Sequence, residues 1–176
     1  MLDLPGLRPS TDRVRETLFN WLGQDLVGLH CLDLFAGTGA LGFEAASRHA
    51  NSVTLLEKDK QAYAKLLANF ALLGSFPAPG EVQILHRDSL EFLKQQADRS
   101  SNLIFIDPPF QEESLLNQAL IEAARVCDDS AGGGIYVEFP ASRPREQIEA
   151  LVPDWHCKKY LEAGQVKACL FRSKKG

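Results

Sequence analysis

A four-residue segment, Asp107-Pro108-Pro109-Phe110, carries groups that suit chemistry on a planar amine. It follows the apolar run 103–106, which predicts a buried parallel strand. The two prolines fix φ and remove two N–H donors, so the loop presents carbonyl acceptors. Asp107 and the Pro108 carbonyl can therefore accept hydrogen bonds from an exocyclic NH2 group while Phe110 stacks on its ring. We take Asp107, Pro108, Pro109 and Phe110 as the candidate catalytic residues.

A glycine-rich segment upstream predicts a site for a cofactor that contains adenosine. Residues 32–42, LDLFAGTGALG, match the pattern G-x-G-x-x-G. Gly37 and Gly39 permit a tight turn and the close approach of a ligand. Glu57, 20 residues after Gly37 and at the end of the next predicted strand, can bind two ribose hydroxyls. Asp88, with Ser89 beside it, ends a third predicted strand and can accept from an adenine amine.

The glycine spacing alone fits both NAD and S-adenosylmethionine. Asp33 lies in the strand before the glycines, where its carboxylate can bind the ammonium group of a methionine moiety, a cation that NAD lacks there. The chain has no Tyr-x-x-x-Lys hydride-transfer pair and no G-x-x-x-x-G-K-[ST] phosphate loop. We therefore expect S-adenosylmethionine, bound by Asp33, Phe35, Ala36, Gly37, Thr38, Gly39, Glu57, Lys58, Asp88 and Ser89.

Alternating strands and helices must position these residues. We expect strands at 31–36, 53–57, 82–85, 103–107 and 135–139, a hairpin of 155–161 with 166–171, and a loop at 75–80. Helices are expected at 40–49, 61–73, 90–97, 115–126 and 145–151. A further helix, capped by Ser10-Thr11-Asp12, is expected before them. The apolar face of the helix at 61–73 is expected to consist of Leu66, Leu67, Phe70 and Leu73. This order predicts the α/β class: one Rossmann-like domain with a mostly parallel seven-stranded sheet, a C-terminal antiparallel β-hairpin and helices on both faces.

Composition fits one domain over residues 1–176, with residues 1–24 beside the site and 25–176 as the core. The net charge of −4 does not suggest a nucleic-acid binder, but Arg8, Arg13 and Arg15 cluster near the start and suit phosphate contacts. The four cysteines are far apart and the histidines lack ligand spacing. We expect reduced thiols, no metal and a cytoplasmic protein, since no signal-peptide or membrane-spanning run is present.

Together, these segments resemble class I S-adenosylmethionine-dependent methyltransferases. More specifically, they resemble the RsmD-type 16S ribosomal RNA guanine-N2 methyltransferases. Residues 7–22, LRPSTDRVRETLFNWL, carry the most specific part of the resemblance. Residues 33–42, 55–57, 107–110, 136–138 and 163–166 also resemble the family, so the resemblance extends over nearly the whole chain.

The resemblance implies methyl transfer to the N2 amine of a guanine in small-subunit ribosomal RNA, guanine 966. It places Thr11 beside the cofactor and Arg8, Arg13 and Arg15 at the RNA entrance. The expected partner is this RNA, free or in an assembled or partly assembled small subunit, and the expected state is a monomer without metal or membrane. Family members usually carry a longer Gly/Arg-rich segment before residue 7, so we expect this chain to bind free RNA weakly.

Three other functions remain open at this stage. Asp-Pro-Pro-Phe also suits the N6 amine of adenine in DNA or RNA. An NAD-dependent oxidoreductase uses the same glycine spacing. A non-catalytic RNA-binding subunit is possible on the same fold, although the intact Asp107–Phe110 segment and Glu57 argue against it.

Overall fold

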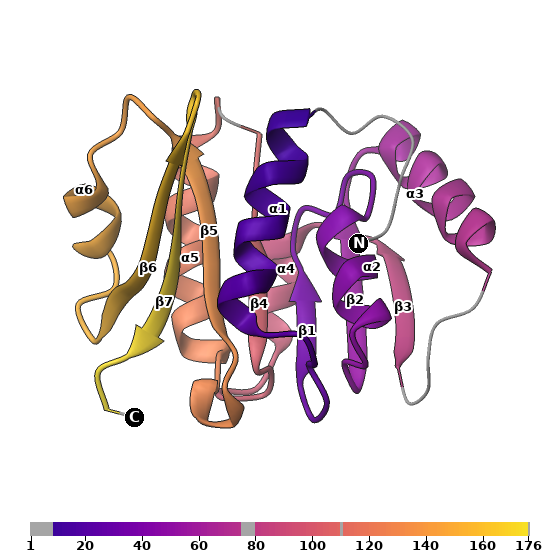
Figure 1. Ribbon diagram of the computed structural model, residues 1–176, viewed down its shortest axis with the longest axis horizontal. Coiled ribbons are helices and arrows are strands. Elements are labelled where there is room, and N and C mark those ends of the chain that lie inside the picture. Colours follow the sequence, from indigo (N-terminus) through magenta and orange to yellow (C-terminus); the bar gives the residue numbers. More distant parts are fainter. Residues whose placement is uncertain (1–8, 75–79, 110, 176) are drawn as a thin grey trace.

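The structure is a computed structural model that describes residues 9–74, 80–109 and 111–175, with only the backbone for 9–11. Within these ranges, seven strands form one sheet (Figure 1): β1 (His30–Asp33), β2 (Ser52–Glu57), β3 (Glu81–His86), β4 (Leu103–Ile106), β5 (Gly134–Pro140), β6 (Trp155–Ala163) and β7 (Val166–Ser173). The helices are α1 (Pro9–Leu22), α2 (Ala40–Ser47), α3 (Lys60–Leu73), α4 (Ser89–Gln95), α5 (Glu113–Val126) and α6 (Arg145–Glu149).

The strand order is β3-β2-β1-β4-β5-β7-β6. The first five strands in this order are parallel, and β7 runs antiparallel to both β5 and β6. This confirms the predicted α/β class and the C-terminal hairpin. The chain moves outward from β1 to β3 and then returns to β4 on the other side of β1. The carboxyl ends of β1 and β4 therefore form a topological switch point, where sheets of this kind bind ligands.

Helices cover both faces of the sheet: α1, α2 and α3 on one, α4, α5 and α6 on the other (Figure 1). Alternation along β4 separates the two cores. Leu103 and Phe105 pack under α1, whereas Ile104 and Ile106 pack against α5. The same alternation directs the next odd-numbered residue, Asp107, toward the face that α1 covers.

Element ends differ from the sequence prediction in a few places. The first strand ends at Asp33 rather than at residue 36, and residues 34–35 form a turn. The turn stays attached to the sheet, since Leu34 N–H donates to Phe105 O and Ala36 N–H donates to Leu56 O. The first helix begins at Pro9, a residue suited to the first helical position, so residues 10–12 lie inside its first turn instead of capping it.

Two smaller predictions concern the apolar face of α3 and the loop that follows it. Leu67 is 41% exposed and does not belong to the buried face of α3, whereas Leu66 is fully buried. The loop expected at 75–80 falls almost wholly outside the described residues. No helix in the described ranges has both the length and the apolar character to cross a membrane.

Candidate active site

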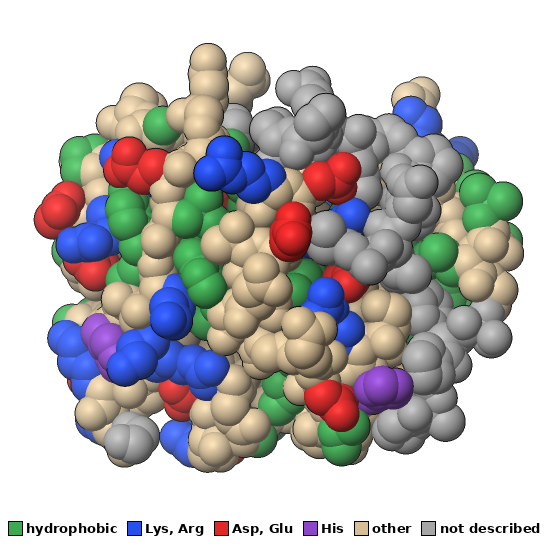
Figure 2. Space-filling view, viewed as in Figure 1, with side chains coloured by type: hydrophobic (Ala, Val, Ile, Leu, Met, Phe, Trp, Pro, Cys, Tyr) green, Lys and Arg blue, Asp and Glu red, His purple; other side chains and the backbone are tan. Residues whose placement is uncertain are grey.

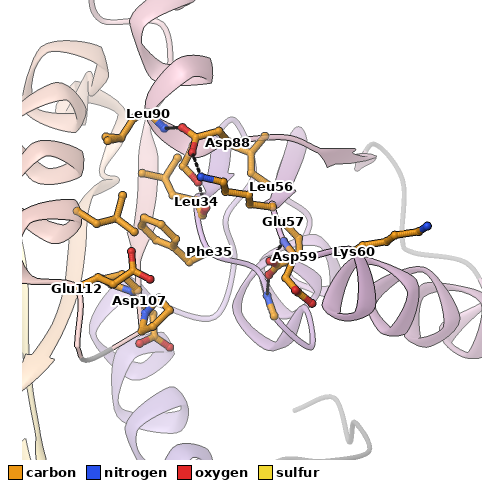
Figure 3. Close-up of a pocket in the computed structure, with 16 residues that line it drawn as sticks. Leu34, Phe35, Leu56, Glu57, Asp59, Lys60, Asp88, Leu90, Asp107 and Glu112 are labelled. Atoms are coloured by element: carbon orange, nitrogen blue, oxygen red, sulfur yellow. Dashed lines mark hydrogen bonds and ion pairs between the residues drawn. The ribbon is translucent and has the colours of Figure 1, made fainter.

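A cavity of about 950 Å³ opens at the carboxyl ends of β1, β2 and β4 (Figure 3). Its size is within the range of small-molecule sites. In Figure 3, Phe35 lies between Asp107 on one side and Glu57 and Asp88 on the other, while Lys60 points away. The cavity brings together nine residues predicted from the sequence: Phe35, Gly37, Glu57, Lys58, Asp88, Ser89, Asp107, Pro108 and Pro109.

The glycines of the loop after β1 serve two purposes. Gly37 has a φ of +54°, and a Cβ built there would meet no atom within 4 Å, so its backbone can be approached closely by a ligand. Gly39 has a φ of +85°, but a Cβ there would collide with Phe43 at 2.1 Å and Leu66 at 2.8 Å. Packing against α2 and α3, rather than approach by a ligand, therefore requires glycine at 39.

The carboxylate of Glu57 is oriented by two backbone donors. Gly37 N–H donates to Oε2 at 3.0 Å, and Asp59 N–H donates to Oε1 at 2.9 Å. Each carboxylate oxygen keeps lone-pair capacity for a further donor. Glu57 lines the large cavity, so it can accept from ligand hydroxyls there.

Asp88 caps α4 instead of ending β3. Its Oδ1 accepts from the N–H groups of Leu90 and Glu91, and its Oδ2 lies 3.0 Å from Lys58 Nζ. The Glu91 N–H lowers the pKa of Asp88 below its usual value, and Lys58 acts in the same direction. Ser89 is buried and its hydroxyl donates to Leu34 O, so this hydroxyl holds the loop after β1.

A second cavity of about 200 Å³ adjoins the first and is lined by charged groups. Asp33 lines it from the end of β1, together with Ala36 and Thr38. Asp33 Oδ2 accepts from Gly42 N–H at 3.0 Å. Burial raises the pKa of Asp33 to about 7, although hydrogen bonds from Gly42 and Phe35 oppose this. Asp33 therefore titrates near neutral pH.

Arg15 also lines the small cavity. The sequence analysis assigned it to the RNA entrance, and the structure buries it there, with only 4% of the residue exposed. One guanidinium nitrogen lies 3.0 Å from Asp12 Oδ1. Val14, Leu18 and Phe19 pack into the core, so α1 turns Arg15 inward over the carboxyl ends of the strands.

Asp107 lines both cavities. It follows β4, and the Pro109 carbonyl accepts from Glu112 N–H at 3.1 Å, which turns the chain into α5. Burial raises the pKa of Asp107 well above its usual value, and the charges of Glu138 and Asp33 raise it further. An Asp107 carboxyl group with a raised pKa lies where the two cavities meet.

Known proteins match this chain over most of its length. The family model described as conserved hypothetical protein 95 matches residues 1–172. Ribosomal RNA small subunit methyltransferase D of Escherichia coli K12 is 39% identical over 173 residues, 97% of this chain and 81% of that protein. The Haemophilus influenzae Rd protein of the same name is 40% identical over 148 residues, 82% of this chain and 74% of its own.

The chain belongs to the RsmD family of methyltransferases.

Solved structures agree with the observed fold of this RsmD-family chain. The yhhF protein of Escherichia coli has a TM-score of 0.75 and 37% identity, covering 98% of this chain and 90% of that one. Magnesium protoporphyrin IX methyltransferase of Synechocystis PCC 6803, solved with bound SAM, has a TM-score of 0.70 and 13% identity. The match covers 92% of this chain and 79% of that one. The latter likeness shows the fold alone, which is that of class I methyltransferases.

The predicted RNA contacts are only partly placed by the structure. Arg13 is exposed on α1, while Arg8, Phe110 and the side chain of Thr11 lie outside the described residues. Figure 2 shows Lys and Arg side chains gathered over β6 and β7 at the lower left. Ile135 pairs with Phe171, so Arg172 and the lysines after it lie beside the start of β5, away from the cavities. Arg172, Lys174 and Lys175 therefore do not adjoin the site, whereas Lys167 pairs with Phe139 near the carboxyl end of β5.

Some residues that build this site in the RsmD-family chain were not predicted from the sequence. Asn69 on α3 donates to Thr38 O at 2.9 Å and so holds the glycine loop. Glu138 on β5 lines the small cavity and is 6% exposed. A glutamate inside the apolar run 134–140 is an unusual feature that could have identified it. Within the described ranges, no cluster of three or more His, Cys, Asp or Glu side chains could hold a metal ion.

Proposed function

We propose that this protein transfers a methyl group from S-adenosylmethionine to the N2 amine of a guanine in small-subunit ribosomal RNA, at guanine 966. The observation that carries the proposal is that Asp107 lines both cavities. A cofactor with its nucleoside in one cavity and its amino-acid group in the other must present its reactive centre between them. An amine acceptor lies at that point.

The donor groups fit S-adenosylmethionine. Glu57 and the open backbone of Gly37 suit a ribose in the large cavity. Asp33 and Arg15 carry opposite charges in the small cavity, which matches the ammonium and carboxylate of a methionine zwitterion. When bound, S-adenosylmethionine supplies an electrophilic methyl group on a sulfonium.

The protein acts on the amine by orientation. The N2 lone pair of guanine is delocalised into the ring, so this amine is a weak nucleophile. Hydrogen bonds from the NH2 group to Asp107 and to the Pro108 carbonyl favour a more tetrahedral nitrogen and direct its lone pair toward the methyl group. Holding two reactants in such a geometry is a major source of rate enhancement.

The substrate base must leave its stack to reach Asp107. Unstacking a base costs a few kcal/mol. Stacking the base on an aromatic side chain contributes ~1–3 kcal/mol, which offsets much of this cost. Phe110, outside the described residues, is the proposed stacking partner. We further propose that residues 1–176 work as one domain, with α1 roofing the small cavity and Arg13 contacting RNA phosphates.

The relatives support ribosomal RNA as the substrate class. The Escherichia coli and Haemophilus influenzae proteins are named as small-subunit ribosomal RNA methyltransferases, and this chain shares 39–40% of aligned residues with them. The Asp-Pro-Pro segment alone suits adenine N6 equally well, so the choice of guanine rests on the family.

A transfer assay with several substrates tests this function. The protein is incubated with methyl-labelled S-adenosylmethionine and, separately, with unmodified small subunits, with their free RNA and with duplex DNA. We expect label in the small-subunit RNA, at one position. Label in DNA alone would replace the proposal with the adenine-N6 alternative, and NAD binding without S-adenosylmethionine binding would replace it with an oxidoreductase.

A further inference from the structure

Glu138 is a buried carboxyl group that the reaction above does not use. It follows Val137, which pairs with Ile106 across β5 and β4. Asp107 follows Ile106 in the same way. The two carboxyl groups therefore leave neighbouring parallel strands side by side, on the face of the sheet that α1 covers.

A hydrogen bond holds the Glu138 side chain: the hydroxyl of Tyr136, itself fully buried, donates to Oε1 at 2.7 Å. Glu138 and Asp107 both line the small cavity from these neighbouring strands. Because two ionised carboxylates repel in a buried site, their proximity favours a proton on one of them, which the two carboxyl groups can share as a hydrogen bond.

The surroundings place that proton on Asp107. A donated hydrogen bond stabilises the ionised form of its acceptor, and Tyr136 donates to Glu138. Burial raises the pKa of both carboxyl groups, and that of Asp107 is also raised by the charge of Glu138. The Asp107 oxygen that faces Glu138 therefore carries the proton, and its other oxygen keeps its lone pairs.

We propose that Glu138, held by Tyr136, is a positioning residue that turns the Asp107 carboxyl group so that its unprotonated oxygen accepts from the substrate amine. This inference rests on the role proposed above for Asp107. Without an acceptor at position 138, the Asp107 hydroxyl can rotate toward the NH2 group. A donor would then face a donor, and the amine would lose its orientation.

Other ionisable groups face this pair from neighbouring elements. Arg15 on α1 and Asp33 at the end of β1 line the same cavity. Tyr136 is fully buried, and burial raises its pKa well above its usual value. Cys169 on β7 packs on the opposite face of the sheet, in the core that α5 covers. A test of Glu138 must therefore compare variants in which Arg15 and Asp33 are unchanged.

Two substitutions separate the effect of the acceptor oxygen at position 138 from the effect of side-chain volume. Glu138→Gln keeps an acceptor oxygen for Asp107, whereas Glu138→Leu fills the space without one. We expect Glu138→Leu to lower the single-turnover rate of methyl transfer by roughly 10–100-fold, the loss seen when a group that orients a reactive residue is removed. Rates are compared at saturating S-adenosylmethionine, because Glu138 also lines the small cavity and its loss can change cofactor affinity. Glu138→Gln should retain most of the rate near neutral pH.

The pH profile of the rate, at saturating cofactor, gives a readout that a structural role would not move. Wild-type protein should lose activity at low pH, when Glu138 takes up a proton and no longer accepts from Asp107. Glu138→Gln cannot take up this proton, so its acid limb should flatten. Tyr136→Phe removes a bond that holds the pKa of Glu138 down, so its acid limb should move to higher pH.

The outcomes distinguish this inference from the proposed function. If Asp107→Ala is inactive but Glu138→Leu transfers at the wild-type rate, the positioning role is wrong and the role of Asp107 stands. If Asp107→Ala is fully active, the proposed mechanism itself fails. If Glu138→Leu does not fold, the pH profiles decide: unchanged acid limbs in both Glu138→Gln and Tyr136→Phe overturn the inference.

Discussion

The backbone N–H of Gly37 donates a hydrogen bond to Glu57 Oε2 at 3.0 Å. This bond joins the loop after β1 to the end of β2, and the second oxygen of the same carboxylate accepts from Asp59 N–H. The Glu57 carboxylate is therefore oriented before any ligand arrives. A preorganised acceptor contributes more to binding than a mobile one, because less conformational freedom is lost on association.

Glu57→Ala should weaken S-adenosylmethionine binding by roughly 1–3 kcal/mol, the range for hydrogen bonds to a charged group. Isothermal calorimetry measures this directly. Glu81→Ala is a matched control, since Glu81 is exposed at the opposite end of the neighbouring strand and its loss changes the net charge equally. Equal affinities for the two variants would remove Glu57 from the ribose site.

The affinity for S-adenosylmethionine should rise with pH as Asp33 loses its proton. Burial raises the pKa of Asp33 to about 7, and an ammonium group binds the ionised carboxylate. Between about pH 6 and about pH 7.5, where α-amino groups stay largely protonated, we expect a gain of up to about tenfold per pH unit. Asp33→Asn should bind weakly, without this slope. A flat wild-type profile would mean that Asp33 does not bind the ammonium group.

Arg15→Gln should weaken S-adenosylmethionine binding by roughly 1–3 kcal/mol, because it removes a charged donor from the cavity that holds the amino-acid part. Arg13→Gln, two residues away but exposed, is the control and should leave this affinity unchanged. Thermal unfolding of both variants checks that α1 remains docked. Unchanged cofactor affinity in a folded Arg15→Gln protein would return Arg15 to a purely structural role.

Arg13→Gln should instead weaken RNA binding, since Arg13 is the described arginine of α1 that remains exposed. Loss of one phosphate contact should flatten the dependence of log affinity on log salt by about 0.7. Small subunits, with free RNA in parallel, are the ligand in a filter-binding series. Lys174→Gln is a charge-matched control beside the opposite end of the sheet. If both variants give the wild-type slope, RNA binds elsewhere.

Most residues at strand ends could be predicted from the sequence. Asp33, Glu57 and Asp107 each end or follow a short apolar run, and the carboxyl ends of parallel strands meet at one edge of a sheet. Local pattern alone was enough to bring them together. The alternation of strands and helices and the terminal hairpin could also be predicted, because apolar segments separated by polar ones indicate both.

Arg15 could not be placed in this way, whereas Glu138 has a local signal, a glutamate inside the apolar run 134–140, that was overlooked. Arginine is rarely fully buried, so its sequence context favoured an exposed side chain. Its burial depends on α1 crossing the carboxyl ends of strands more distant in the chain, which is a tertiary effect. The φ of +85° at Gly39 fits the predicted tight turn, but its packing role was missed, since the collision with Phe43 and Leu66 involves helices beyond the loop.

The identity of the methylated nucleoside tests the central claim most directly. Unmodified small subunits are incubated with methyl-labelled S-adenosylmethionine and either wild-type protein or Asp107→Ala, and the RNA is digested to nucleosides for mass spectrometry. The account predicts N2-methylguanosine from the wild type. It predicts at least about a hundredfold less from Asp107→Ala, the scale for removal of one oriented polar group, at unchanged cofactor affinity. Label in N6-methyladenosine, or a wild-type rate from Asp107→Ala, would contradict it.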